Sequence, residues 1–163
     1  MTTTKTILLG QLAAAYDKNG WFSCLKYCLK GLTPEQAAWK PEGADNSIYE
    51  IINHLNYYNN AYLERFRGHD HESSLADNDE TFDHSEAESW EAEVARFETI
   101  MDGWRAEMEK AGEAKFDELA PPGNESKWKA VISNIIAHAA HHGGQIVILR
   151  KLQGSWDSSG DVS

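Results

Sequence analysis

Two histidines near the carboxyl end of the chain, His138 and His142, have the spacing of a metal-binding pair. Residues four apart in an α-helix lie one turn apart on the same face, so two imidazoles at this spacing can bind one ion from a single rigid element. The zinc helices of HExxH proteases use this geometry. Here the intervening residues are Ala139, Ala140 and His141, so the HExxH glutamate and the general base that it supplies are missing.

A third histidine, His54, lies on the apolar side of another predicted helix, between Ile51 and Tyr58. Because an unpaired imidazole is costly to bury, His54 is expected either to hydrogen-bond to a core carbonyl or tyrosine, or to be a third ligand. Three neutral imidazoles without a fourth protein ligand leave positions for water or substrate. The sequence therefore predicts one open site for a divalent transition metal at His54, His138 and His142. These ligands suit Zn and Ni, and also Fe, Co or Cu.

Two alternative arrangements of histidines stay open. His138 and His141 form an HxxH pair, which competes with the HxxxH pair as the metal-binding register. In addition, His69, His71 and His84 lie in an acidic segment, where a surface metal cluster is an alternative to solvated loop residues, which we favour. The aspartates of that segment are Asp70, Asp77, Asp79 and Asp83.

Three further side chains are candidates to assist the ligands by hydrogen bonding or proton transfer. Glu50 lies one turn before His54, Tyr58 lies one turn after it, and Gln145 lies one turn beyond His142. Each also has a structural explanation, Glu50 as the acid of a helix-capping box, Tyr58 as a core residue and Gln145 as a packing residue. No independent general base is evident, so no catalytic residue is assigned.

Four long segments with helical periodicity must position these residues. They run from about Thr4 to Lys30, from Ser47 to Gly68, from Ser85 to Gly112, and from about Ser126 to Gly154. Thr33-Pro34-Glu35-Gln36 predicts one short helical turn after the first helix, and we expect residues 69–84 to form a loop. We therefore predict an all-α fold, a four-helix bundle with a short extra helical turn after its first helix. The lengths of the connections do not fix the topology.

Apolar residues within the helices indicate which faces form the core. In the third helix they recur at spacings of three and four, at Trp90, Val94, Phe97, Met101, Trp104 and Met108. In the first they include Leu8, Leu12, Trp21, Leu25 and Leu29. The last helix contains Gly143-Gly144, which permits close backbone approach by another helix or leaves room beside the ion. A short strand over 146–149 after these glycines is the alternative, against which the continuous helical period argues.

Composition indicates a single soluble domain. We expect residues 1–154 of the 163 to form one bundle and residues 155–163 a polar tail. No apolar stretch is long enough to span a membrane, and we see no secretory signal. A formal net charge of −11 opposes binding to nucleic acid or to an anionic membrane. Cys24 and Cys28 are expected to be free and buried in one helix, which fits a cytoplasmic location.

Several motifs together resemble those of the DinB-like superfamily, over nearly the whole chain. The motifs are 31–36 (GLTPEQ) with 39–41 (WKP), 47–55 (SIYEIINHL), 138–146 (HAAHHGGQI) and 149–151 (LRK). The resemblance implies an up-down-down-up four-helix bundle, often dimeric. It also implies a metal bound by one histidine of the second helix and two of the last, which here are His54, His138 and His142.

Some members of this superfamily are metal-dependent thiol transferases that use a low-molecular-weight thiol, and others are described as hydrolases. The resemblance therefore implies an enzyme that activates a thiol or water for a small-molecule substrate. The alternative is a non-catalytic bundle, in which the metal is structural or absent and the protein acts through a protein partner.

Overall fold

The computed structural model describes residues 2–69, 77–83, 85, 89–121 and 125–160. Within these ranges the chain is helical, and its β-pairing is a single antiparallel bridge between Leu119 and Lys127. The all-α prediction is therefore confirmed. The helices are α1 (Thr4–Tyr16), α2 (Leu25–Leu29), α3 (Pro34–Ala38), α4 (Ile48–Phe66), α5 (Trp90–Lys110) and α6 (Trp128–Leu152), with 3₁₀ turns η1 (Asp79–Phe82) and η2 (Glu113–Asp117). None of these helices is long and apolar enough to cross a membrane.

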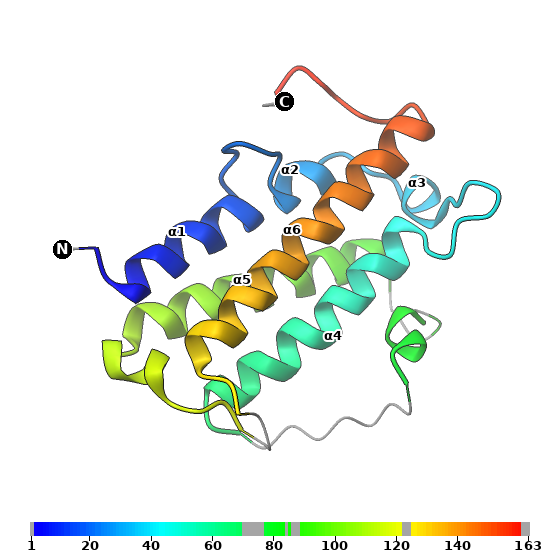
Figure 1. Ribbon diagram of the computed structural model, residues 1–163. Coiled ribbons are helices and arrows are strands. Elements are labelled where there is room, and N and C mark those ends of the chain that lie inside the picture. The colour runs from blue at the N-terminus through cyan, green and yellow to red at the C-terminus, as the bar shows by residue number, and fades with distance from the viewer. Residues whose placement is uncertain (1, 70–76, 84, 86–88, 122–124, 161–163) are drawn as a thin grey trace.

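The four long helices α1, α4, α5 and α6 lie side by side (Figure 1). α1 and α5 run in opposite directions, since Lys5 near the start of α1 donates to the carbonyl of Ala111 just after α5, at 2.8 Å. At the other end of α1, the Tyr16 hydroxyl donates to the carbonyl of Glu98, 3.4 Å away.

α4 runs parallel to α5 and antiparallel to α6. Arg67, directly after α4, forms an ion pair with Glu107 near the end of α5, at 3.5 Å. In contrast, Phe66 at the end of α4 packs edge-on against Trp128 at the start of α6, with ring centroids 5.0 Å apart. The middles of α4 and α6 therefore face each other across the bundle, which is where the predicted metal ligands lie.

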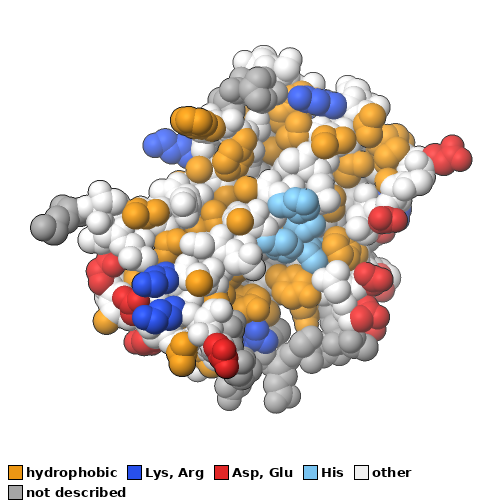
Figure 2. All heavy atoms as spheres, viewed as in Figure 1, with side chains coloured by type: hydrophobic (Ala, Val, Ile, Leu, Met, Phe, Trp, Pro, Cys, Tyr) orange, Lys and Arg blue, Asp and Glu red, His pale blue; other side chains and the backbone are white. Residues whose placement is uncertain are grey.

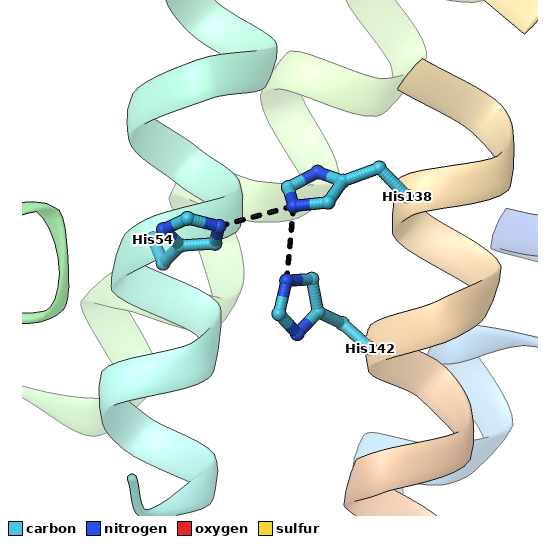
Figure 3. Close-up of side chains that lie close together, drawn as sticks. All are labelled: His54, His138 and His142. Atoms are coloured by element: carbon cyan, nitrogen blue, oxygen red, sulfur yellow. Dashed lines mark hydrogen bonds between the residues drawn. The ribbon is translucent and has the colours of Figure 1, made fainter. Parts of the chain in front are cut away.

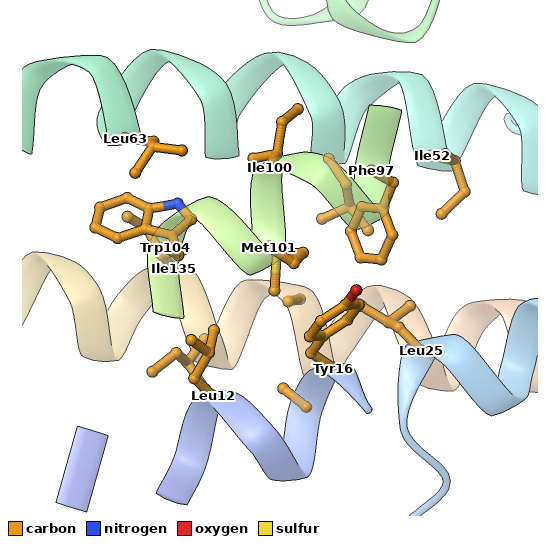
Figure 4. Close-up of a cluster of buried hydrophobic side chains, with 14 of the residues drawn as sticks. Leu12, Tyr16, Leu25, Ile52, Leu63, Phe97, Ile100, Met101, Trp104 and Ile135 are labelled. Atoms are coloured by element: carbon orange, nitrogen blue, oxygen red, sulfur yellow. The ribbon is translucent and has the colours of Figure 1, made fainter. Parts of the chain in front are cut away.

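The core fills the space between the four long helices, as the cluster in Figure 4 shows. The apolar stripe predicted for α5 is confirmed. Five of its six members are buried, and the sixth, Val94, is partly buried and packs against the core. Burial of such a side chain is worth about 1.5–3 kcal/mol relative to exposure. The largest fully buried side chains are Trp104, Trp128, Tyr16, Phe97 and Phe116.

Capping signals in the sequence predicted two helix starts correctly. Thr33 and Gln36 form the reciprocal capping box of α3, with Pro34 at its first turn. Ser47 and Glu50 form the same arrangement at the start of α4. Each box satisfies two backbone N–H groups that the helix leaves without an internal partner.

The predicted first helix, Thr4–Lys30, is wrong in its middle. α1 ends at Tyr16 and α2 begins at Leu25, and the chain turns between them. The physical reason is local, because the side-chain oxygen of Asn19 accepts a hydrogen bond from the backbone N–H of Cys24 at 3.0 Å, which competes with helical bonding. Trp21, which we expected in the core, is consequently 98% exposed.

The two cysteines are buried and form no disulfide, as expected, but they do not share one helix. Cys24 is the N-cap residue of α2, whereas Cys28 lies within α2. The start of α5 also differs from the prediction, since its N-cap is Ser89 rather than Ser85. The Ser89 hydroxyl accepts from the backbone N–H of Ala92 at 3.1 Å. Residues 86–88, which the prediction placed in the first turn of this helix, lie outside the described residues.

α6 runs without a break through Gly143 and Gly144, so the alternative of a strand over 146–149 is wrong. The interpretation of the glycines as a close helix contact is also wrong. A Cβ at Gly143 would make only ordinary contact with Leu25, at 3.6 Å, and a Cβ at Gly144 would meet nothing within 4 Å.

The described part of the C-terminal tail packs back onto α2. The hydroxyl of Tyr27 donates to the carbonyl of Asp157 at 2.9 Å, and its ring packs edge-on against Trp156. The expected boundary between a bundle of residues 1–154 and a tail of residues 155–163 stays a prediction.

Candidate metal centre

The structure brings together the three histidines predicted as metal ligands. His54 extends from α4 toward α6, and His138 and His142 extend from successive turns of α6 (Figure 3). The Nε2 atom of His138 lies 3.0 Å from Nε2 of His54 and 3.0 Å from Nε2 of His142. One potential ligand atom from each residue lies within 4.8 Å of the others. His54 and His142 are buried, and His138 is partly buried.

These spacings fit one shared ion. Zinc bonds to imidazole nitrogen at about 2.0–2.1 Å, which places two ligand nitrogens about 3.0 Å apart at a right angle and about 3.4 Å apart at the tetrahedral angle. The observed separations of 3.0 Å fall at the right-angle end of this range. His138 is therefore spaced to share an ion with either neighbour. To bind the same ion, the nitrogens of His54 and His142, which lie within 4.8 Å of each other, must be no more than about 4.2 Å apart, twice the zinc–nitrogen bond length.

The hydrogen bond at Nδ1 of His54 determines which of its two ring nitrogens carries the hydrogen. Nδ1 of His54 lies 2.6 Å from the hydroxyl oxygen of Thr81. That hydroxyl donates its single hydrogen to the carbonyl of Asn78 at 2.6 Å, so toward His54 it accepts. Neutral His54 therefore carries its hydrogen on Nδ1, and its Nε2 lone pair points toward the other two histidines.

His142 is held in the same way. Its Nδ1 lies 2.6 Å from Oε1 of Gln145, and a carbonyl oxygen only accepts. The Nε2 lone pairs of His54 and His142 therefore both face Nε2 of His138, which in the neutral form carries at most one hydrogen. Three lone-pair positions thus share at most one proton, and a cation satisfies them all. Because these lone pairs face one another with too few protons between them, the three histidines fit a metal ion.

Burial keeps these imidazoles neutral, as metal ligands must be. It lowers the pKa of His54 to about 3, with a further contribution from neighbouring His142 and His138. It lowers the pKa of His142 to about 4, with His138 adding to the effect. The pKa of His138 is also lowered, mainly by burial and then by His141.

A cavity of about 430 Å³ opens beside the three histidines. Figure 2 shows histidine side chains at the surface of this face, bordered by hydrophobic ones. The lining is aromatic, amide and imidazole in character, and within the described residues it includes no Asp, Glu, Lys or Arg. It consists of His54, Tyr58, Asn59, Tyr62, Asn78, Phe82, Asn134, Ile135, His138, His141 and His142.

The structure brings two of the three predicted assisting residues to the site. Gln145 pairs with His142, as described above. Tyr58 lines the cavity with its ring centroid 5.0 Å from that of His54, and its hydroxyl donates to the side-chain oxygen of Asn78 at 3.1 Å. Glu50 is elsewhere. Its carboxylate accepts from the backbone N–H of Ser47 at 2.6 Å and from Lys40 at 2.9 Å.

The alternative histidine arrangements are not favoured. His141 is exposed and lines the cavity, but the group of converging ligand atoms is formed by His54, His138 and His142. In the acidic segment, His69 binds Glu64 at 2.6 Å, and His71, His84 and Asp70 lie outside the described residues.

The aspartates of the acidic segment serve local turns where the structure describes them. Asp77 accepts from the backbone N–H groups of Asp79 and Glu80, and Asp83 accepts from that of Ser85. Among the described residues, the metal-compatible group is the three-histidine cluster alone.

Sequence reasoning missed Thr81 and Phe82, because it assigned residues 69–84 to a loop. The turn η1 instead places Phe82 parallel to the imidazole of His54, with ring centroids 4.0 Å apart and planes 9° apart. The sequence offered only a weak sign that these two residues contact the site, namely a Thr-Phe pair within a strongly acidic segment.

Comparison with known proteins found one family match. A family model described as the DinB superfamily matches residues 24–146, which is most of the chain and includes all three histidines of the cluster. Searches of curated proteins and of solved structures found no match.

Proposed function

The chain belongs to the DinB superfamily, and on that premise we propose that it is a metal-dependent enzyme with one divalent ion at His54, His138 and His142. The observation that carries the proposal is the convergence of three Nε2 atoms, two of them with their lone pairs directed inward by contacts at Nδ1. Zinc or nickel is the expected ion, since three neutral imidazoles suit both.

The site combines free coordination positions on the ion with a partly enclosed space for a substrate. Held by these three nitrogens, a zinc ion would lower the pKa of water to about 7 and would hold a thiol as thiolate. The cavity provides space next to the cluster, and its volume of about 430 Å³ lies in the range of small-molecule sites. Tyr58 and Asn78 offer hydrogen bonds on the cavity wall, while Phe82 provides an apolar surface.

The proposed reaction is transfer of a thiol to an electrophile, or hydrolysis. The substrate would be a small molecule, with a low-molecular-weight thiol as one candidate. The described lining contributes no carboxylate or lysine, and its imidazole outside the cluster is that of exposed His141. We assign no general base.

The directions of the long helices support an up-down-down-up bundle. α1 and α6 would run one way, and α4 and α5 the other, as the pairwise contacts between them indicate. A homodimer and a cytoplasmic location stay predictions.

The rival proposal is a non-catalytic bundle in which the metal is structural. Structural zinc sites are usually closed by four protein ligands. The cluster here has three, and a cavity lies beside it. This difference favours an enzyme over a scaffold.

A turnover assay separates the two proposals. Zinc- or nickel-loaded protein is incubated with a chromogenic aryl halide plus cysteine or 2-mercaptoethanol, and separately with a chromogenic ester. We expect metal-dependent turnover in one of these assays and its loss in His138→Ala. The surface variant His69→Ala is the control and should retain it. Absence of turnover in every assay, by protein shown to be loaded, would favour the scaffold.

A further inference from the structure

The turn η1 encloses the outer side of His54. Thr81, at the centre of this turn, is only 2% exposed. It accepts a hydrogen bond from His54 and donates one to Asn78, each at 2.6 Å. Two consecutive hydrogen bonds therefore link the imidazole to a backbone carbonyl. The imidazole donates to the Thr81 hydroxyl, and the hydroxyl donates to the carbonyl.

A second contact fixes the plane of the same imidazole. Phe82 stacks against His54 nearly in parallel, while Thr81 holds Nδ1 in the ring plane. Stacking limits tilting of the ring, and the hydrogen bond limits its rotation about the Cβ–Cγ bond. Together they leave Nε2 with one direction, toward His138.

The turn itself is fastened to α4 by the residue next to His54. The side-chain amide of Asn53 donates to the carbonyl of Thr81 at 2.9 Å and to that of Asp83 at 2.6 Å. The position of the Thr81 hydroxyl is thus set relative to the backbone that carries His54, although 27 residues separate the two along the chain.

We propose that Thr81 is a positioning residue of the metal centre, which holds His54 in the tautomer and orientation that binds metal. This inference rests on the proposed metal-binding function and extends it to the connection between α4 and α5. Loss of such a partner behind a metal-binding imidazole typically costs about 10–100-fold in metal affinity. We expect a loss of that size when the hydroxyl is removed.

The test compares Thr81→Val, which keeps the shape without the hydroxyl, with Thr81→Ser, which keeps the hydroxyl. Zinc dissociation constants are measured by competition with a chromophoric chelator. Thr81→Val should bind about 10–100-fold more weakly, and Thr81→Ser should restore most of the affinity. Thr99→Val, which removes an exposed hydroxyl that donates to Ala95, is the matched control and should bind like the wild type. Wild-type affinity in Thr81→Val would overturn the proposal.

A second measurement needs no variant and no metal. Long-range ¹H–¹⁵N NMR spectra of the metal-free wild type at neutral pH report the tautomer of His54, and we expect hydrogen on Nδ1. Hydrogen on Nε2 would overturn the proposal even if Thr81→Val failed to fold. If the wild type bound no zinc, the proposed function would fail, and this spectrum alone would decide the role of Thr81.

Discussion

His54 and His138 belong to helices of opposite direction, and their Nε2 atoms lie 3.0 Å apart across the bundle. Neither α4 nor α6 can form the three-histidine cluster alone, since α6 supplies only the pair His138 and His142. The site therefore exists only in the packed fold. A metal that binds this packed form and not the unfolded chain must stabilise it.

The first prediction concerns the ligands. His54→Ala, His138→Ala and His142→Ala should each weaken zinc binding by more than about 100-fold, because removal of a ligand costs more than loss of a partner behind it. His141→Ala should leave the affinity unchanged, since the His141 side chain is exposed and outside the converging group. Chelator competition measures all four. A large loss in His141→Ala alone would mean that the HxxH register binds the metal.

The second prediction concerns the stability of the metal-free protein in acid. Well above pH 6.5, the ordinary pKa of histidine, the clustered histidines are neutral in both the folded and the unfolded chain, so their ionisation does not affect stability. As pH falls below 6.5, the unfolded chain takes up protons that the folded chain does not, because burial holds the folded pKa of His54 at about 3 and that of His142 at about 4. The free energy of unfolding should therefore fall between pH 6.5 and the folded pKa values.

Urea unfolding at several pH values measures this slope. His54→Gln should flatten it, and His141→Gln, at an exposed position, should keep it. An identical slope in the wild type and in His54→Gln would show that His54 is not held neutral by burial.

The third prediction compares two glycines in helix interiors. Gly144→Ala should raise the free energy of unfolding by about 0.5–1 kcal/mol, because alanine favours the helix and its Cβ meets nothing within 4 Å. Gly103 is the contrast. A Cβ there would lie 2.9 Å from Cδ2 of buried Leu63, so Gly103→Ala should give no gain or a loss. Equal stabilisation by both changes would contradict the close packing of α4 against α5.

The fourth prediction separates Glu50 from the metal centre. Glu50→Ala removes the acceptor of the Ser47 N–H and of Lys40, and should lower the free energy of unfolding by about 0.5–1.5 kcal/mol. Zinc affinity should not change. Thermal unfolding and chelator competition on the same sample provide both values, and a clear loss of affinity would return Glu50 to the site.

Local signals predicted much of the fold. The capping boxes at Thr33 and Ser47 and the periodicity of α5 depend on residues a few positions apart, so they can be read without knowledge of the tertiary structure. The same is true of His138 and His142, whose spacing follows from helical geometry alone. His54 could be added because an imidazole on an apolar face needs a partner.

Non-local contacts could not be predicted in this way. Thr81 approaches His54 from 27 residues away, across a connection with no apolar period. The break after Tyr16 was missed although the periodicity carries a sign of it. Trp21 lies about 180° from Leu12 around a continuous helix, so the apolar stripe changes face between them, where Asn19 bonds to the backbone N–H of Cys24. Helix directions likewise depend on packing and not on the length of the connections.

The central claim is that this chain binds one transition metal through three histidines. The most direct test is elemental analysis of protein purified without a nickel column, together with its melting temperature before and after addition of zinc or nickel. We expect about one divalent ion per chain after loading, and a higher melting temperature that is lost in His54→Ala. A negligible metal content, with a melting temperature unchanged by either ion, would contradict the account.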